Sequence, residues 1–343
     1  MSRYRQAGVD LQLARRMKAR LPALLRRATR PEVVGGVGRF GGLFRARFPG
    51  HRDPVLVASM DGVGTKLRVA VEMGCHHTIG QDLVNHCCND IAVMGADPLF
   101  FLDYIGTGKL ENRVFRQVIT GLAKACSEAG VALLGGETAQ MPGFYGNGDY
   151  DLVGTIIGVV DRKRILDGSQ VRPGDVLIGL ASTGLHTNGY SLARDVLFKR
   201  MKLRAISCPK VLGGMSVGAA LLKVHRNYHP FLAALRKGHI EIHAAAHITG
   251  GGFEENVLRV IPQDCCVRIQ RRSWEAPPIF RLIREGGAVS DEEMHRVFNM
   301  GLGMLCLVPK PSVERLHRLA ARSRIRSWEV GGVERGKRSV VFD

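Results

Sequence analysis

The sequence predicts an α/β or α+β fold of about two domains. The chain has 343 residues, which is enough for two hydrophobic cores. Its hydrophobic content of 45% and its 42 glycines are typical of globular proteins that are rich in turns. Short apolar runs alternate along it with stretches in which apolar residues recur at helical spacing. We place the domain boundary at the turn over 172–175, which gives domains 1–170 and 171–343.

The charge and the cysteines limit the class of protein. A formal charge of +18 favours anionic partners, but the basic residues are scattered and no nucleic-acid motif is present, so we expect a phosphorylated metabolite and no specific nucleic acid. No apolar run is long enough for a membrane span, and the first ten residues do not resemble a signal peptide. Eight cysteines without a C-x-x-C motif indicate reduced thiols. These features predict a cytoplasmic protein without a membrane partner.

Local patterns predict the elements of the first half. We expect Asp10 to cap a first helix that Pro22 interrupts. The predicted helices cover 10–30, 79–94 and 114–129, and the predicted strands cover 54–58, 98–104, 131–134 and 152–160.

The second half shows the same kinds of pattern. Residues 217–237 have a helical pattern on both sides of Pro230. The other predicted helices cover 190–201, 253–260, 279–285, 291–298 and 312–322, and the predicted strands cover 176–181, 300–308 and 340–342.

The first predicted strand leads into a turn that carries chemistry. Asp61 ends the strand, Gly62 and Gly64 let the backbone approach a ligand, and Thr65 and Lys66 add a hydroxyl and a cation. A carboxylate for a metal ion, exposed backbone N–H groups and a lysine are typical of a nucleoside-triphosphate site. An ordinary strand-to-helix turn with an aspartate cap is the alternative at this point.

Further carboxylates come from two other elements. The strand over 131–134 ends on two glycines and Glu137, and the apolar helix over 79–94 carries Asp82, His86, Asn89 and Asp90. Buried carboxylates need a partner or a metal ion. We therefore expect Asp61, Asp90 and Glu137 to converge on one Mg²⁺–phosphate site. The histidines and cysteines between Cys75 and Cys88 match no zinc spacing.

Two glycine-rich segments have alternative interpretations. Gly36, Gly38 and Gly41 form a G-x-G-x-x-G motif, but a helix precedes it, so a loop that closes over phosphates is favoured over a dinucleotide fold, with a plain connector as the alternative. In the second half, His186 and Asn188 lie among small residues between a strand and a helix. A histidine in such a place is more often functional than structural.

These blocks, in this order, resemble the phosphoribosylformylglycinamidine cyclo-ligase family, the AIR synthetases, over nearly the whole chain. The matching blocks are Tyr4-x-x-Ala7-Gly8-Val9-Asp10, Arg30-Pro31-Glu32-Val33, Asp61-Gly62-Val63-Gly64-Thr65-Lys66, Asn89-Asp90 with Gly95-Ala96, Phe101-Leu102-Asp103-Tyr104, Gly135-Gly136-Glu137-Thr138, His186-Thr187-Asn188-Gly189-Tyr190-Ser191-Leu192 and His247-Ile248-Thr249-Gly250-Gly251-Gly252.

The resemblance implies an α+β fold, in which an N-terminal domain pairs its sheet across a homodimer and a larger C-terminal domain follows. It implies ATP with Mg²⁺ and the closure of formylglycinamidine ribonucleotide to aminoimidazole ribonucleotide. By the resemblance, Asp61 and Asp90 hold Mg²⁺ with help from Glu137, and Lys66 lies against phosphate. His186 contacts the substrate or the reacting amide with Asn188 beside it, and the loop over 35–42 covers the nucleotide.

The chain also departs from the family's usual pattern. Relatives often have a lysine near Arg20-Leu21-Pro22 and usually a Pro-Thr pair within the block over 221–228, and the residues over 85–88 and Arg39 are unusual. Two alternatives stay open. One is a related ATP-dependent enzyme that activates another acceptor, such as a thiamine-phosphate kinase or a selenide dikinase. The other is a non-catalytic basic protein that binds RNA, which would bind in a salt-sensitive way.

Overall fold

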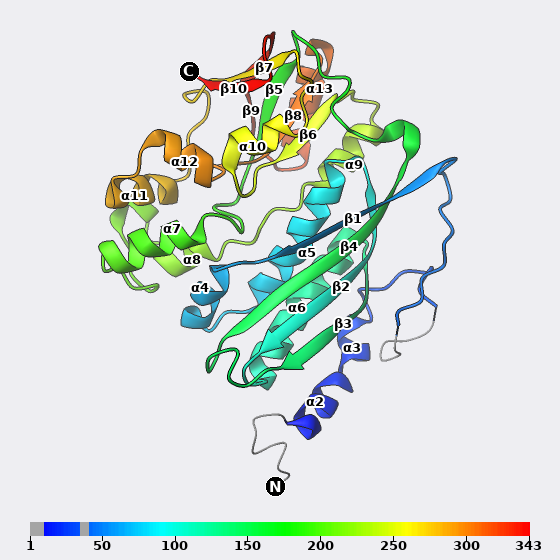
Figure 1. Cartoon of the computed structure of the whole chain (residues 1–343), viewed down its shortest axis with the longest axis vertical. Coiled ribbons are helices and arrows are strands. Elements are labelled where there is room, and N and C mark those ends of the chain that lie inside the picture. Colours follow the sequence, from blue (N-terminus) through cyan, green and yellow to red (C-terminus); the bar gives the residue numbers. More distant parts are fainter. Residues whose placement is uncertain (1–9, 35–40) are drawn as a thin grey trace. The chain divides into compact units, whose positions relative to one another are not determined.

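The computed structural model describes residues 10–34 and 41–343, and these form two compact units that each contain a sheet (Figure 1). The first unit comprises the described residues up to Ile91 together with Asp97–Arg162, and the second comprises Ala92–Ala96 and Lys163–Asp343. The short segment Ala92–Ala96 belongs to the second unit because Ala92 lies in its core and Arg236 Nη1 donates a hydrogen bond to Gly95 O at 2.9 Å. Over the described ranges, no helix is both long enough and apolar enough to cross a bilayer.

The first unit is built on a four-stranded sheet in the order β1-β4-β2-β3. Its strands are β1 (Pro54–Gly62), β2 (Asp97–Thr107), β3 (Ala132–Gln140) and β4 (Tyr150–Asp161). β4 pairs antiparallel with both neighbours, and β2 pairs parallel with β3. Burial alternates along β1, so that Leu56 and Met60 are 59% and 68% exposed on one face, as expected for a sheet covered by helices on one side.

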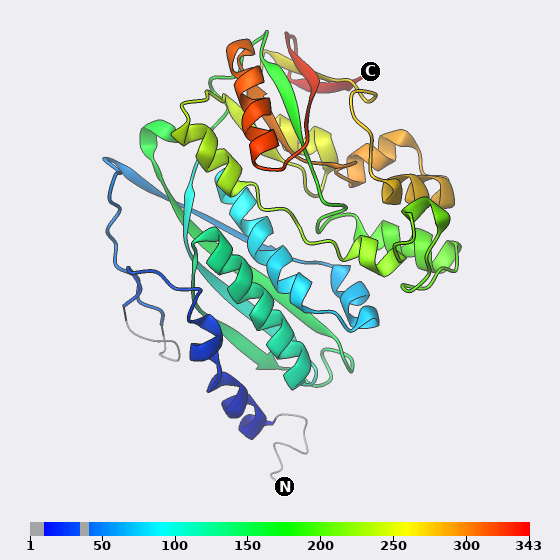
Figure 2. The same ribbon diagram turned by 180° about the vertical axis from the view of Figure 1, so that it is seen from behind.

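Two helices cover the other face of this sheet, α5 (His77–Ala92) and α6 (Asn112–Ala129), as Figure 2 shows. They approach closely where Gly80 of α5 meets Val118 and Gly121 of α6 meets His77, because a Cβ at either glycine would collide with the backbone of the other helix. Gly130 ends α6 with a φ of 68°, as predicted.

The N-terminal region confirms the predicted cap and the predicted interruption. It contains α2 (Leu11–Lys18) and α3 (Leu21–Leu25), and α4 (Lys66–Met73) follows β1. Asp10 Oδ1 accepts a hydrogen bond from Leu13 N at 2.9 Å and so caps α2. The helix is interrupted between α2 and α3. Pro22 lies in the first turn of α3, where its missing N–H costs no hydrogen bond.

The second unit is built on a six-stranded mixed sheet in the order β10-β7-β9-β5-β8-β6. Its strands are β5 (Val176–Ala181), β6 (Ala244–His247), β7 (Cys265–Ile269), β8 (Leu302–Val308), β9 (Ser327–Arg335) and β10 (Ser339–Phe342). Its helices are α7 (Tyr190–Arg194), α8 (Val217–Leu221), α9 (His229–Lys237), α10 (Gly252–Leu258), α11 (Pro278–Gly287), α12 (Asp291–Val297) and α13 (Val313–Arg322). Every residue of β8 is buried, and α9 and α13 pack over the sheet around a core that includes Phe231, Met304 and Leu316.

Several sequence predictions are wrong in extent. The helical pattern over 217–237 splits into α8 and α9, and the break lies at residues 222–228 rather than at Pro230, which is in the first turn of α9. The strand expected over 131–134 continues to Gln140, because Gly136 lets β3 lie close against Asp103 of β2. The helix expected over 190–201 becomes α7 followed by a π-helix over Asp195–Arg200. The strands β6, β7 and β9 were not predicted.

The prediction of reduced thiols is confirmed. All eight cysteines lie within the described ranges, and each is a free thiol. Five of them, Cys87, Cys88, Cys126, Cys265 and Cys306, are buried, where a cysteine behaves as a small apolar side chain.

Candidate functional site

The turn after β1 holds a carboxylate in a fixed position. Asp61 Oδ1 accepts a hydrogen bond from Gly62 N at 2.6 Å, and Gly64 adopts a φ of 60° that favours glycine. The N-cap of α4 is Thr65, whose side chain does not cap the helix. Asp61 is therefore not a helix cap, and its second oxygen, Oδ2, points to another partner.

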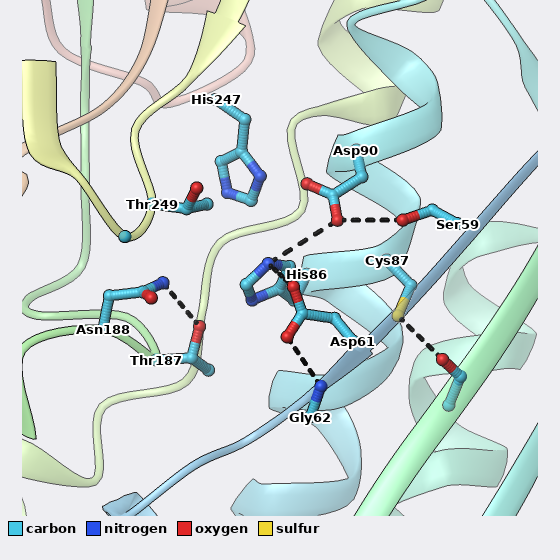
Figure 3. Close-up of polar contacts among 12 residues, drawn as sticks. Ser59, Asp61, Gly62, His86, Cys87, Asp90, Thr187, Asn188, His247 and Thr249 are labelled. Carbon is cyan, nitrogen blue, oxygen red and sulfur yellow. Dashed lines mark hydrogen bonds and ion pairs between the residues drawn. The ribbon is translucent and has the colours of Figure 1, made fainter. Parts of the chain in front are cut away.

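That partner is His86 of α5 (Figure 3). His86 Nε2 lies 2.9 Å from Asp61 Oδ2 and 3.6 Å from Asp90 Oδ2, one helical turn further along α5. Ser59 of β1 donates a hydrogen bond to the same Asp90 oxygen at 3.2 Å. The end of β1 and the face of α5 thus bring Asp61 and Asp90 together around one imidazole nitrogen, and we call Asp61, His86 and Asp90 the acidic cluster.

Opposite charges determine the protonation of this cluster. Burial alone would lower the pKa of His86, but the hydrogen bond to Asp61 and the nearby carboxylates raise that pKa above its ordinary value. Burial would raise the pKa of Asp61, but the hydrogen bond and the charge of His86 hold it below its ordinary value. Both shifts favour an imidazolium between two carboxylates. The cluster therefore attracts positive charge at neutral pH.

Two carboxylates from neighbouring elements suit a divalent cation. Asp61 is 43% exposed and Asp90 is 24% exposed, so both can be reached from solvent, whereas His86 is almost fully buried behind them. Carboxylate oxygens are ligands of Mg²⁺, which usually keeps several waters and is held by one or two protein carboxylates. The two carboxylates of the acidic cluster are therefore ligands of the kind that the implied metal ion takes.

Lys66 does not reach this surface, which corrects the expectation that it lies against phosphate. Its ammonium is 2.8 Å from Asp82 Oδ2, and both side chains are fully buried. Burial lowers the pKa of Lys66, and the charge of Asp82 opposes that shift. A buried, paired lysine holds α4 against α5 and does not meet an incoming phosphate.

Glu137 does not join the acidic cluster, which corrects the predicted convergence. Glu137 is on β3 and Asp61 is on β1, and these are the two edge strands of the sheet. In the strand register, Asp61 pairs with Gly154, Gly154 with Asp103 and Asp103 with Gly136. Three strand spacings of about 4.8 Å therefore separate the two carboxylates within one chain.

The glycine loop can be followed only in part. Gly36 and Gly38 lie outside the described residues. Gly41 is described, is exposed, and has open space where a side chain would be. Its proposed contact with a nucleotide stays a prediction.

The second unit contains a cluster of histidines, His186, His225 and His247, all buried. His225 Nε2 lies 2.9 Å from His247 Nε2, and His225 Nδ1 lies 3.3 Å from Thr187 Oγ1. Asn188 Nδ2 donates to Thr187 Oγ1 at 3.4 Å, as the dashed line in Figure 3 marks. The tautomers of the two rings decide which atom donates in the contacts of His225. These contacts fix the orientation of the imidazoles.

The histidine cluster is better suited to hydrogen bonding than to holding a metal ion. The rings of His186 and His225 are stacked with centroids 4.0 Å apart and an angle of 20° between their planes. Lone pairs of imidazole lie in the ring plane, so two nearly parallel rings cannot both point them at one ion. Thr183 N also donates to His186 Nε2 at 3.2 Å, which occupies that lone pair.

His186 and Asn188 differ in their exposure to solvent. His186 is 1% exposed, has a φ of 63° and packs beside Gly303, where a Cβ would collide with its ring. Asn188 is partly exposed. The sequence reasoning did not find His225, which lies in the block that departs from the family pattern, and it noted His247 only within a matching block.

The fold and the site define an AIR synthase-like protein. Residues 45–160 match the family description "AIR synthase related protein, N-terminal domain", and residues 172–343 match "AIR synthase related protein, C-terminal domain". A phosphoribosylformylglycinamidine cyclo-ligase from Syntrophotalea carbinolica is 49% identical over 313 residues, which is 91% of this chain and 89% of that protein. The chain belongs to the phosphoribosylformylglycinamidine cyclo-ligase family, the ligases of purine biosynthesis, which confirms the resemblance and the predicted α+β class.

Solved structures with low sequence identity share the fold. A thiamine-monophosphate kinase from Stenotrophomonas maltophilia K279a has a TM-score of 0.70 at 18% identity, and the match covers 98% of this chain and 96% of the kinase. The hydrogenase maturation protein HypE in complex with ATP has a TM-score of 0.66 at 18% identity, with 98% and 93% covered. The two alternative functions, another acceptor and RNA binding, are not favoured.

Proposed function

We propose that this chain catalyses the ATP-dependent ring closure of formylglycinamidine ribonucleotide to 5-aminoimidazole ribonucleotide, with release of ADP and phosphate. The observation that carries the proposal is that Asp61, at the glycine turn after β1, and Asp90 of α5 both lie beside His86 Nε2. The name of the 49% identical relative supplies the substrate class.

The reaction needs charge stabilisation more than it needs a strong acid or base. The formyl oxygen is a poor leaving group until ATP transfers its γ-phosphoryl group to it, which releases ADP. An internal nitrogen then attacks the activated carbon, the new C–N bond closes the ring, and the C–O bond breaks to release phosphate. The protein must hold both substrates in line and stabilise the developing negative charge.

We assign the nucleotide to the first unit. Asp61 and Asp90 would hold Mg²⁺, which when bound neutralises phosphate charge. The backbone at Gly62, Gly64 and Thr65, and the loop that contains Gly36, Gly38 and Gly41, would approach the phosphates. The ATP complex of HypE, a protein of the same fold, supports a nucleotide site in this fold.

We assign recognition of the other substrate to the second unit. The partly exposed Asn188 would contact the substrate or the reacting amide, and its own amide is already oriented by Thr187. His186 would act beside it, and His225 and Thr183 hold the ring of His186 in place.

We also propose a homodimer in the cytoplasm. The exposed face of the first unit's sheet carries Leu56 and Met60, and apolar side chains on an open sheet face are typical of an interface. A second copy of this face would cover it, with 1–170 as the nucleotide-binding and dimerisation domain and 171–343 as the C-terminal domain. The eight free thiols support a reducing compartment.

The test is to supply formylglycinamidine ribonucleotide with Mg²⁺ and ATP and to measure the products. We expect ADP and the imidazole product in equal amounts, and little ADP when the ribonucleotide is omitted. An absence of ADP with this ribonucleotide, together with ADP release with another acceptor, would indicate a related enzyme that activates a different acceptor. Salt-sensitive RNA binding without ADP release would contradict the proposal.

A further inference from the structure

The second unit contains a basic groove that the proposed reaction does not use. It lies where α13 leads through a short turn into β9 (Figure 2), has a volume of about 490 Å³, and is lined by residues that include His317, Arg324, Arg326, Ser327 and Trp328. We infer that this groove, which we call the α13 groove, is a second ligand site that binds a nucleoside monophosphate. The phosphate would meet the arginines, and the flat base would meet the tryptophan.

Two cations of the α13 groove are available to an anion. Among the described residues, no carboxylate forms an ion pair with Arg324 or Arg326, and both side chains are exposed. Another groove of this unit differs in this respect, because its Arg284 is paired with Asp291 at 3.1 Å. A guanidinium group matches the geometry of a phosphate and binds it through two hydrogen bonds. The α13 groove therefore offers two guanidinium groups to one phosphorylated ligand.

The backbone that carries Arg324 is held in place. Arg324 has a φ of 56°, and its N–H donates to Ala321 O at 3.0 Å. The next residue, Ile325, is buried in the core and donates its N–H to Ala320 O at 2.8 Å. A site whose backbone is already ordered loses less conformational entropy when a ligand binds.

The α13 groove also presents a flat aromatic surface. Trp328 is half-buried, and the guanidinium carbon of Arg326 lies 4.9 Å from the centroid of its ring, which is a cation–π contact. Nucleobases stack on aromatic rings and on arginine planes. His317 Nδ1 lies 2.7 Å from Ser327 Oγ, and this contact joins α13 to β9 beside the tryptophan. The groove therefore combines groups for a phosphate with groups for a base, within the volume range of small-molecule sites.

The alternative is an ordinary solvated surface with scattered arginines. Such a surface attracts any phosphate weakly, and salt screens the attraction. It gains nothing from a base, because no ring of the ligand is in contact with the protein. The two interpretations therefore differ in whether the base adds to the affinity of the phosphate.

The experiment titrates the whole chain with AMP and follows tryptophan fluorescence. The chain has two tryptophans, and Trp274 is only 8% exposed, so Trp274→Phe leaves Trp328 as the single reporter. We expect a saturable change in emission with AMP. Ribose 5-phosphate lacks the base and adenosine lacks the phosphate, so we expect each to bind at least about tenfold more weakly than AMP.

Charge variants locate the bound AMP. In Arg324→Gln and in Arg326→Gln we expect the affinity for AMP to fall by about tenfold, because each change removes a charged hydrogen-bond donor to the phosphate. The matched control is Arg322→Gln, because Arg322 is an exposed arginine in the last turn of α13 that does not line the groove. We expect this variant to keep the wild-type affinity. Trp328→Phe, which retains Trp274, should lose the fluorescence response.

Several outcomes would overturn the inference. One is a wild-type protein whose fluorescence does not respond to AMP, and another is equal affinity for AMP and ribose 5-phosphate. A response that persists unchanged in Arg324→Gln and Arg326→Gln would place AMP elsewhere, for example at the nucleotide site assigned to the first unit. Tighter binding of an adenine oligoribonucleotide than of AMP would make the ligand an RNA strand. The wild-type titrations decide the question even if Trp274→Phe does not fold.

The inference does not depend on the proposed function, and the two tests are separate. The ring-closure test measures ADP and the imidazole product, whereas the AMP titration is done without ATP, Mg²⁺ or the ribonucleotide. Ring closure without a response of Trp328 to AMP would overturn this inference alone. A response that depends on Arg324 and Arg326, without ADP release from ATP and the ribonucleotide, would overturn the proposed reaction and leave the α13 groove as a nucleotide site.

Discussion

The acidic cluster of the first unit and the histidine cluster of the second hold buried polar groups by different means. In the acidic cluster, opposite charges meet, with His86 Nε2 2.9 Å from Asp61 Oδ2. In the histidine cluster, hydrogen bonds join the rings to neighbouring polar groups, and a stacked ring pair and a nearby glycine fix their positions. Charge pairing creates a place for a cation, whereas hydrogen bonding and ring stacking create a fixed shape. The proposed roles follow this difference, with phosphate chemistry assigned to the first cluster and substrate recognition to the second.

The largest effect should come from the buried pair that supports the acidic cluster. Lys66→Met leaves the charge of Asp82 buried without its cation, so we expect a loss of about 3–5 kcal/mol in the free energy of unfolding. Urea unfolding measures it. The double variant Lys66→Met/Asp82→Leu removes both charges and should recover most of the loss. Wild-type stability of Lys66→Met together with a raised KM for ATP would instead show that Lys66 contacts phosphate.

The next largest effect is expected on the rate of the reaction, and it tests whether the acidic cluster takes part in that reaction. Asp61→Asn keeps the size of the side chain but removes the charge, so we expect ADP release with the ribonucleotide to fall by about 10²–10³-fold. The control is Asp53→Asn, which breaks an exposed pair with Arg162 in the same unit and should leave the rate unchanged. Equal rates in the two variants would remove the acidic cluster from the reaction.

Local patterns predicted much of the fold but less of the site. The amphipathic helices α6 and α13, the buried strand β8 and the carboxylate at the end of β1 follow from residue spacing within single elements. The strand β6 was missed because Ala-Ala-Ala-His has little strand propensity, and β9 because Gly331 and Gly332 interrupt its apolar pattern.

The errors in the site come from pairings between distant residues. Glu137 was grouped with Asp61 because both follow short apolar runs, but the strand order puts them at opposite edges of the sheet. Lys66 was assigned to phosphate because its partner, Asp82, lies 16 residues away and on another helix. The spacing of His86 and Asp90, one helical turn apart, was the available signal for the acidic cluster.

A smaller loss of stability is expected when the packing of the histidine cluster changes without a change of charge. Gly303→Ala would push a methyl group into Tyr228 and His186, so we expect a loss of about 1–3 kcal/mol from overpacking in the histidine cluster. Gly62→Ala has space, since the nearest atom is Leu152 O at 3.5 Å, and it should change stability by less than about 0.5 kcal/mol. Chemical unfolding of both variants measures the contrast. Similar losses would show that both clusters are equally tightly packed.

The smallest effect concerns the pH range over which the acidic cluster is stable without metal. The pKa of His86 is raised, so its contribution to stability is complete below about pH 6.5 and is lost as the pH rises through its raised value. The pKa of Asp61 is lowered, so its contribution is present above about pH 4 and is lost as the pH falls through its lowered value. Urea unfolding with a chelator should therefore show that the wild type loses stability from pH 6 to pH 9 more steeply than His86→Gln. Parallel pH profiles would mean that His86 carries no charge between the carboxylates, and that charge pairing does not distinguish the acidic cluster from the histidine cluster.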